Sequence, residues 1–360
     1  MRLSLPRPVR ALLAIDRTDP IRSRALAIGA LGMAVPVALG LLLGQPHAGF
    51  LIGLGAVLLA GGPAEASVAG SDRAMRLLTM ALPALAAVAT ATLLARLPAA
   101  DPAMILMVAI AALSVNYSRP LAAAAIRFNI YCVLGMTLIE GSTAHGAGSA
   151  LVFGLGALWN ILLRLLLDPR GQAESALVQP QRRQPSPAQR RAHFRKQLHS
   201  LAGWQFSLRL AIGLGIASML RHAFPTHHFA WLVLTVPLLT EHGIVPLPLK
   251  TLQRLLGTFG GVALAWLLFA LAYGPIALGI VAAVLATLVP VARARSYLLY
   301  AILSAPLILL VIDIGHPATT ALLVDRMVAT LIGGAIVVAL NLAFDRLLAL
   351  APPAMPSAGR

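Results

Sequence analysis

Charged residues are scarce in this chain, and acidic residues are the scarcest of them. Only 11% of the 360 residues are charged, and Asp and Glu together number 12 against 28 Lys and Arg. Apolar residues reach 59%, whereas soluble globular proteins have about 45–50% apolar and about 25% charged residues. A soluble fold of this length cannot bury so much apolar surface. The composition therefore excludes that class and indicates a chain that folds in a lipid bilayer.

Cysteine and the common catalytic signatures are also missing. The one cysteine, Cys132, lies inside an apolar run, which excludes an intrachain disulfide and a cysteine-based metal site. No zinc-protease, nucleophile-elbow, P-loop or dinucleotide-binding motif occurs in a suitable context. His222, His227 and His228 share one loop, but no carboxylate joins them in the sequence and their spacing matches no catalytic zinc site. We expect no catalytic residues, no metal and no cofactor, and we predict that the protein is not an enzyme.

The net charge of +16 is compatible with nucleic acid or anionic lipid as a partner. The arginines lie in short gaps between apolar runs, without the interleaved aromatic residues that stack on single strands. We therefore predict a lipid bilayer and no nucleic acid among the partners. The first apolar run, Leu26–Leu43, has no convincing cleavage site and is interpreted as a span that is retained.

Apolar segments that could cross a membrane recur along the chain, since about 20 helical residues cover the hydrocarbon layer. The first six are predicted at 25–43, 48–63, 76–96, 102–117, 119–139 and 147–167. The second six are predicted at 205–221, 228–242, 251–273, 275–291, 296–313 and 325–349. The predicted fold is all-α, with about twelve transmembrane helices. The predicted parts are a basic cytoplasmic N-terminus 1–24, a first membrane half 25–167, a cytoplasmic basic linker 168–203, a second membrane half 204–350 and a cytoplasmic tail 351–360.

The linker is rich in Pro, Gln and Arg and has little to bury, which predicts a flexible segment. Its last part, RRAHFRKQLHSLAGW, has two open interpretations. It forms a basic amphipathic helix on the membrane surface, or it is a helix that leads into the seventh span.

The two halves resemble each other in sequence. LAIGALG at Leu26–Gly32 corresponds to LAIGLGI at Leu210–Ile216. Further pairs are Arg76 with Arg254, Arg119 with Arg295, and Asn160 with Asn341. All of these pairs are separated by about 180 residues, which favours an ancient duplication. Six spans per half is an even number, so we predict parallel repeats related by an axis along the membrane normal.

The arginines also predict the orientation. With the N-terminus in the cytoplasm, only Arg96, Arg221 and Arg326 fall on the opposite side, and Arg127 falls within a span. The other basic residues lie on the cytoplasmic side, as the positive-inside rule requires. We therefore predict a multi-pass protein of the inner membrane with both termini in the cytoplasm.

Arg127 is the sharpest functional feature of the sequence. It follows Arg119 by eight residues, which places it about 12 Å into the membrane. A charge at that depth faces the bundle interior or an aqueous path. The functional interpretation is an anion-binding group assisted by Asn129 and Tyr131. The alternative is an arginine that is satisfied by backbone carbonyls or extends to the cytoplasmic surface.

Three further features point to a permeation path. The second and eighth spans are short and interrupted by Gly or Pro, at Gly61, Gly62 and Pro63 and at Pro237, Pro246 and Pro248. Such breaks free backbone groups at membrane depth in a permeation path, or each span is a short helix that runs into a cytoplasmic loop. Arg76 and Arg254 open the third and ninth spans, with Thr79 and Thr258 nearby. These arginines either bind substrate or anchor lipid headgroups.

No acid lies in the middle of a span. Acids of the membrane halves fall near span ends, among them Glu65, Glu140, Glu241, Asp313, Asp325 and Asp345. This pattern favours an anionic substrate and leaves proton coupling through those acids or His242 open.

The eighth and ninth spans carry a family resemblance. FAWLVLTVPLLTEHGIVPLPLKTLQRLLGTFGGVALAW resembles the membrane module of the FUSC (fusaric acid resistance) family, matched by Trp231, Arg254, Gly257, Thr258 and Gly261. The closing segment DRMVATLIGGAIVVALN is similar through Arg326, Gly333 and Gly334. The resemblance covers about 205–346 and is weaker in the first half. It implies efflux of aromatic or other organic acids and a distant kinship with plant aluminium-activated malate channels.

Together these features predict an integral membrane transporter that exports small organic, aromatic anions across the bacterial inner membrane. An anion channel and a membrane protein without transport activity are the alternatives. The predicted partners are the bilayer, a small organic anion and, in a possible homo-oligomer, further copies of the chain. The predicted substrate-binding residues are Arg127, Asn129, Tyr131, Arg76, Arg254, Thr258, Trp231 and His242.

Overall fold

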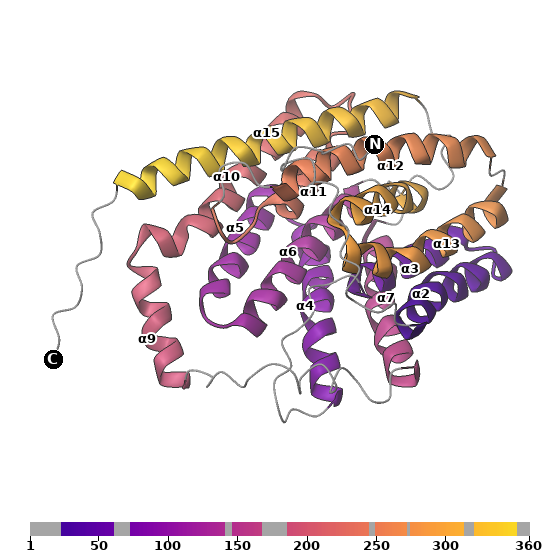
Figure 1. Cartoon of the computed structure of the whole chain (residues 1–360), viewed down its shortest axis with the longest axis horizontal. Coiled ribbons are helices and arrows are strands. Elements are labelled where there is room, and N and C mark those ends of the chain that lie inside the picture. The colour runs from indigo at the N-terminus through magenta and orange to yellow at the C-terminus, as the bar shows by residue number, and fades with distance from the viewer. Residues whose placement is uncertain are drawn as a thin grey trace, which may run out of the picture.

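The protein is described by a computed structural model over residues 23–60, 73–140, 146–167, 186–244, 249–271, 274–312 and 320–350. The regular secondary structure in this part of the chain consists of helices, and no strand is present there (Figure 1). The first group of helices is α2 (Ser23–Leu42), α3 (Pro46–Ala60), α4 (Arg73–Leu94), α5 (Ala100–Leu113), α6 (Arg119–Glu140) and α7 (Gly146–Leu167). The second group is α10 (Leu201–Ala223), α11 (Ala230–Leu239), α12 (Leu249–Leu271), α13 (Gly274–Arg295), α14 (Tyr297–Ile312) and α15 (Thr320–Leu350). A short 3₁₀ turn, η1 (Ser114–Asn116), follows α5, and α9 (Pro187–Leu198) lies between the groups.

Each of the twelve predicted spans corresponds to one of these helices. Six of them are long and apolar enough to cross a membrane, namely α2, α6, α7, α12, α13 and α15. The remaining six are shorter or more polar, and α11 has only 10 residues. Pro237 was predicted to break the eighth span, but α11 continues past it and ends at Leu239. Gly61, Gly62, Pro63, Pro246 and Pro248, as well as Glu65 and Asp313, lie outside the described residues.

The surface of the bundle is as apolar as the composition requires. Large side chains such as Leu42, Met219, Leu271, Ile276 and Trp266 are exposed over 63–82% of their area. Monomeric soluble proteins rarely present apolar surface on this scale. Acyl chains are therefore the natural solvent for the outside of this bundle.

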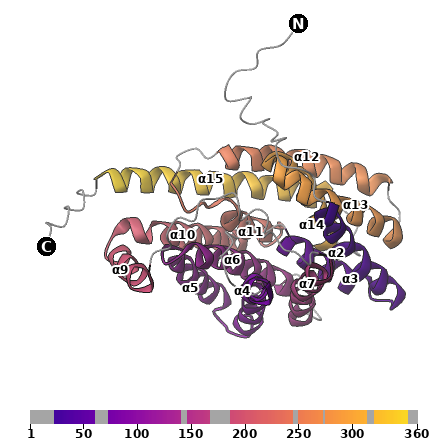
Figure 2. The same ribbon diagram turned by 60° about the horizontal axis from the view of Figure 1, so that its bottom comes forward.

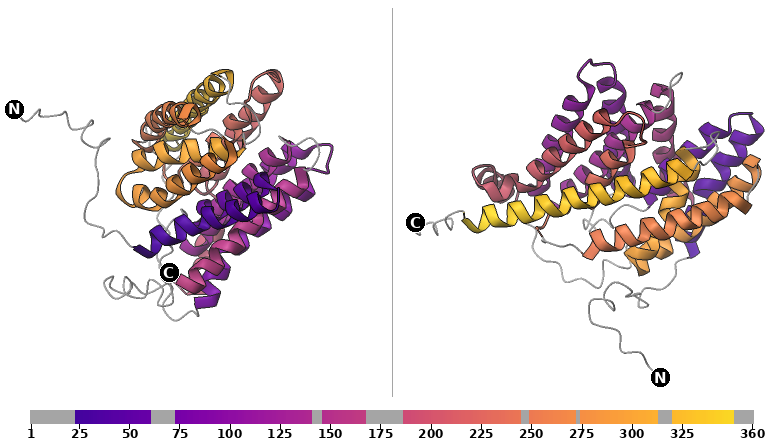
Figure 3. Two further views of the ribbon diagram at one scale, coloured as in Figure 1. Left: turned by 90° about the vertical axis from the view of Figure 1, so that its right-hand side faces the viewer. Right: turned by 90° about the horizontal axis from the view of Figure 1, so that it is seen from above.

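The two groups of helices are built by the same contacts. In the first group α3 packs on α2 and α7, and α4 packs on α6 and α7. In the second group α11 packs on α10 and α15, and α12 packs on α14 and α15. Between the groups, α2 contacts α13 just as α10 contacts α5, and α3 contacts α14 just as α11 contacts α6. Figures 2 and 3 show α12, α13, α14 and α15 lying beside α2 to α7.

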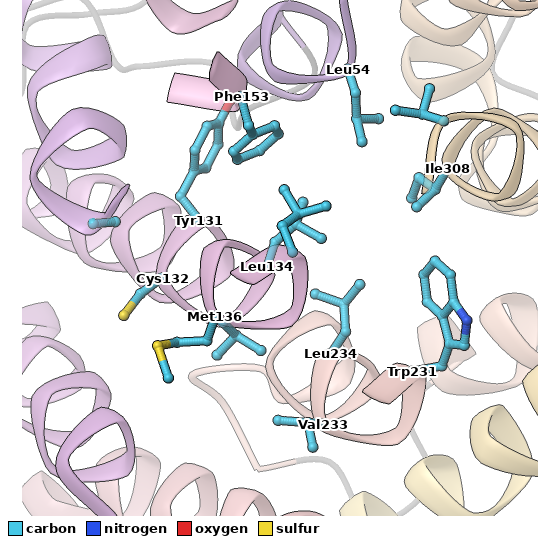
Figure 4. Packing of buried hydrophobic residues seen from close by; sticks show 14 of the residues in the cluster. Leu54, Tyr131, Cys132, Leu134, Met136, Phe153, Trp231, Val233, Leu234 and Ile308 are labelled. Carbon is cyan, nitrogen blue, oxygen red and sulfur yellow. The ribbon is translucent and has the colours of Figure 1, made fainter. Parts of the chain in front are cut away.

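The core lies where the two groups meet. Leu54 of α3, Leu134 of α6, Leu234 of α11 and Ile308 of α14 are each at most 5% exposed. Figure 4 shows these side chains directed into one shared region, with Trp231 at its edge. The seam between the two groups is thus filled by apolar side chains in this structure.

Glycines allow α12 to pack closely on α14. Gly257 and Gly261 on α12 face Ala301 and Ala305 on α14, in the GxxxG spacing typical of close helix packing in membranes. A Cβ atom added to Gly261 would lie 2.7 Å from the Ala305 Cβ and 2.8 Å from the Ile302 carbonyl oxygen. This packing fixes α12, and with it Arg254, against α14.

We predict that Gly261→Val lowers the free energy of unfolding by about 1–3 kcal/mol, because the added methyl groups force α12 away from α14. Thermal unfolding of the purified protein in detergent, followed by size-exclusion chromatography, measures the change. Gly215→Val is the matched control, since a Cβ at Gly215 meets no atom within 4 Å. Equal melting temperatures for the two variants would contradict the assigned packing.

Candidate functional site

The contacts between helix termini define two ends of the bundle. At one end, here called the near end, the Asn116 side chain after α5 donates to the carbonyl oxygen of Gly203 near the start of α10 at 2.8 Å. The Asn116 Oδ1 lies 3.3 Å from His242 Nε2, just beyond α11. At the opposite, far end, Arg221 at the end of α10 meets Asp101 at the start of α5. The near end is the end predicted to be cytoplasmic.

The near end of α11 is held by a buried arginine. Arg209 of α10 is 1% exposed, and its Nη2 donates to the carbonyl oxygens of Glu241 at 2.8 Å and His242 at 3.1 Å. Its Nη1 donates to Asn341 Oδ1 on α15, and its Nε donates to the Gln205 carbonyl oxygen. A helix end leaves backbone carbonyls unpaired, and inside a membrane protein these must find donors. The Arg209 guanidinium supplies them and ties α10, α11 and α15 together.

The corresponding helices of the first half carry a related arrangement. Asn160 of α7, the predicted counterpart of Asn341, donates to the carbonyl oxygen of Ala56 on α3 at 3.0 Å and accepts from Arg164 Nε at 2.9 Å. In the first half an asparagine on the last helix thus donates directly to a carbonyl of the second helix. In the second half the asparagine accepts from Arg209, which in turn donates to carbonyls of the loop after the second helix.

Arginine and tyrosine side chains gather close to this end of α11. The Arg293 guanidinium lies 5.3 Å from the centre of the Tyr300 ring, and the Tyr297 and Tyr300 rings are 5.8 Å apart. Arg254 of α12 is 6% exposed and lies within electrostatic range of the Tyr297 hydroxyl, as do Arg293 and one carboxylate, Glu241. Arg254, Arg293, Tyr297 and Tyr300 are called the near-end cluster below.

Arg127 and Tyr131 extend this cluster into the first half. Both are buried on α6, at 3% and 2% exposure, and they are one helical turn apart on the same face. The Tyr131 hydroxyl donates to the Gly55 carbonyl oxygen at 2.7 Å and lies within electrostatic range of Arg127 and Tyr300. The buried Asn129 points elsewhere, because a residue two positions away faces the other side of a helix.

The other predicted site residues are distributed along the helices. Thr258 is buried on α12 one turn beyond Arg254. The Arg76 side chain lies outside the described residues, although its backbone is part of α4. His242 is in the loop after α11, stacked on Phe206, and partial burial together with the Arg209 charge lowers the pKa of its imidazole. This ring is therefore neutral at pH 7.

Trp231 is placed apart from the other predicted residues. It lies at the far end of α11, about 12 Å by helix rise from Leu239, where the helix ends before His242. Its ring is covered by the guanidinium of Arg326 from α15, whose Cζ is 3.7 Å from the ring centre. The two residues that carried much of the family resemblance thus form a cation–π pair between α11 and α15.

The far-end histidines correct one sequence interpretation. A carboxylate does join them: Asp325 Oδ1 lies 2.8 Å from His227 Nδ1, and Oδ2 accepts from the backbone amide of His228 at 2.9 Å. Asp325 comes from α15, which is distant in sequence, so no local spacing could reveal the contact. Within the described residues no group of three His, Cys, Asp or Glu side chains could hold a metal ion.

Sequence reasoning missed Arg209, Arg293, Tyr297 and Tyr300. Arg209 was taken as one of the cytoplasmic boundary residues, because it follows the linker closely. The tyrosines carry a usable signal, since both lie one turn apart after Arg293 and Arg295. What the sequence does not show is that α14 places them against α12 and near α6.

We predict that Arg209→Gln lowers the free energy of unfolding by about 2–4 kcal/mol, because two carbonyl oxygens and Asn341 lose a charged donor. Thermal unfolding in detergent at neutral pH measures the loss. Arg164→Gln, which removes the donor of Asn160 at a half-buried position, is the control and should cost less than about 1 kcal/mol. Equal losses in the two variants would show that Arg209 has no special role.

Comparison with known proteins supports the resemblance found in the sequence. Residues 214–340 match the family model described as fusaric acid resistance protein-like, and this stretch runs from the middle of α10 to the last part of α15. It includes Arg254 and the near-end cluster. No curated protein and no solved structure matches the chain significantly. Over residues 214–340, therefore, this multi-pass membrane protein is similar to the fusaric acid resistance protein-like family.

Proposed function

We propose that the protein exports small organic anions across the bacterial inner membrane and that the near-end cluster, with Arg127, is where the anion binds. The observation that carries the proposal is the convergence of cations from both halves at one end of the seam. Arg127 comes from α6, Arg254 from α12 and Arg293 from α13. One carboxylate, Glu241, lies within electrostatic range of Tyr297 in the same cluster.

This composition suits a carboxylate attached to an aromatic ring. A guanidinium binds a carboxylate through two parallel hydrogen bonds. Tyr297 and Tyr300 offer ring faces and hydroxyl donors beside Arg254 and Arg293, so an aromatic anion can stack while its carboxylate is neutralised. An inorganic cation would meet repulsion here, which agrees with the shortage of acids inside the predicted spans.

The membrane arrangement of the proposal follows the paired helix contacts. We infer that α2 to α7 and α10 to α15 are duplicated units that both span the bilayer six times. The contact of α2 with α13 is equivalent to that of α10 with α5, and the contact of α3 with α14 is equivalent to that of α11 with α6. These equivalent contacts support an approximate twofold axis along the seam. The near end then faces the cytoplasm, with the termini, and the anion is captured from inside the cell.

The apolar seam favours a carrier over a channel. Leu54, Leu134, Leu234 and Ile308 fill the region between the halves (Figure 4). A charged solute cannot cross such packing without water or a counter-charge. Passage therefore requires the two halves to move relative to each other, as in alternating access.

The proposal is tested with protein reconstituted in liposomes and loaded with labelled benzoate. We predict that Arg127→Gln and Arg254→Gln each raise the KM for benzoate about tenfold or more, because loss of a charge-assisted hydrogen bond costs about 1.4 kcal/mol or more. Arg119→Gln is the matched control, since Arg119 begins the same helix as Arg127 but is exposed. It should leave the KM unchanged.

Two results would contradict the proposal. One is full activity of both variants, which would remove these arginines from the path. The other is the absence of flux for a broad panel of anions, which would favour a membrane protein without transport activity. Flux that rises linearly with concentration, accompanied by single-channel currents, would replace the carrier by an anion channel.

A further inference from the structure

The helix α9 has a composition unlike that of any other helix in the described part. Its sequence PAQRRAHFRKQL contains Arg190, Arg191, Arg195 and Lys196 and no acid. Its start is fixed by a capping box, in which Ser186 and Gln189 satisfy each other's backbone amides. None of its residues is buried. The sequence left two interpretations of this segment open: an amphipathic surface helix, or a helix that leads into the seventh span. The structure shows a separate helix, α9, which ends at Leu198 before α10 begins at Leu201.

The place of α9 is set by contacts at the near end. The Phe194 ring meets the Tyr117 ring edge-on at a centre distance of 5.9 Å, and the Trp204 indole nitrogen donates to the Leu198 carbonyl oxygen at 2.8 Å. The Phe194 ring and the Leu198 carbonyl thus attach α9 to the bundle. Its cations remain on the outside, where Arg191, Arg195 and Lys196 are exposed.

The neighbouring helix α10 shows which surface lies next to these cations. Its exposed apolar residues Leu201, Trp204, Ile212, Ile216 and Met219 are between 37% and 74% exposed. At 100° per residue these five positions fall on one stripe of the helix. An apolar stripe of this length, with a tryptophan in its first turn, is typical of a helix that faces lipid from the headgroup level inward.

We propose that the exposed cationic face of α9 binds the phosphate headgroups of anionic phospholipids. The lipid stripe of α10 begins at Leu201, three residues after α9 ends, so α9 lies at the depth where that stripe reaches the headgroups. Its charge is opposite to that of the headgroups. Each Lys or Arg close to an anionic bilayer strengthens binding by a factor of about five.

Contacts around Asn116 connect α9 to the near end of α11. Tyr117, whose ring meets Phe194 of α9, directly follows Asn116 in the chain. Asn116 in turn contacts Gly203 at the start of α10 and His242, whose carbonyl accepts from Arg209. A headgroup that immobilises α9 therefore also steadies the loop at the mouth of the anion site. This second step rests on the proposed function, whereas the binding of lipid by α9 does not.

Hydrogen exchange of the full-length protein in nanodiscs tests the binding. Discs of phosphatidylcholine are compared with discs of an equal mixture of phosphatidylcholine and phosphatidylglycerol. We predict that the α9 amides exchange about tenfold more slowly in the anionic discs and that high salt removes the difference, because exposed charges are screened.

Charge variants show whether the α9 cations cause the protection. Arg191→Gln, Arg195→Gln and Lys196→Gln combined should abolish it, and Arg191→Lys with Arg195→Lys should keep it. Arg96→Gln, an exposed cation after α4, is the control and should behave as the wild type. Equal exchange in the two kinds of disc, or protection that survives in the triple Gln variant, would overturn the proposal. Protection that appears only when an acidic polypeptide is added to neutral discs would assign the face to a protein partner and would also overturn it.

The exchange measurement does not depend on transport. If benzoate flux is absent but α9 is protected by phosphatidylglycerol, the proposed function fails and the lipid site stands. If flux occurs and the lipid has no effect on exchange, the lipid site fails alone.

Discussion

The carbonyl groups at the near end of α11 are the constraint on which the site depends. The helix α11 has only 10 residues, and the chain that follows it lies inside the protein, where its carbonyls need donors. The Arg209 guanidinium donates to the carbonyls of Glu241 and His242 in this loop, and the same group holds Asn341 on α15. Glu241 is thereby held within electrostatic range of the Tyr297 hydroxyl. Without this buried charge, the position of the loop beside the proposed anion site would not be defined.

The two halves surround their paired asparagines with different residues. In the first half Asn160 donates to the Ala56 carbonyl of α3 directly, and the arginine that donates to Asn160, Arg164, is only half-buried. In the second half a fully buried arginine, Arg209, stands between Asn341 and the loop after α11. The second half therefore carries an additional positive charge deep in the bundle. It is also the half that matches the family model and that contributes Arg254, Arg293 and both tyrosines to the cluster.

Much of the fold was predictable because long apolar runs mark the positions of helices. All twelve predicted segments correspond to helices. The site was predictable only in part. Arg127 is found because a lone charge in an apolar run is conspicuous. Arg209 is hidden, because a sequence cannot show whether a charge near a span end reaches the surface or turns inward. Asp325 is assigned to the far-end histidines only by the fold, since nearly 100 residues separate them.

The charges of the two ends differ in a way that bears on direction. At the far end Arg221 pairs with Asp101 and Glu140, Asp325 meets two histidines, and Arg326 stacks on Trp231. At the near end Arg209 is satisfied by neutral oxygens, and Arg254 and Arg293 lie, together with Glu241, within electrostatic range of the Tyr297 hydroxyl.

The proposed export of an anion from the near end agrees with this difference. The carboxylates of Asp101, Glu140 and Asp325 oppose the approach of an anion at the far end, and the arginines at the near end favour it. For a carrier in the proposed orientation, with the near end in the cytoplasm, such a difference suits capture on the near side and release on the far side. An importer built on the same helices would need these acids at the near end instead.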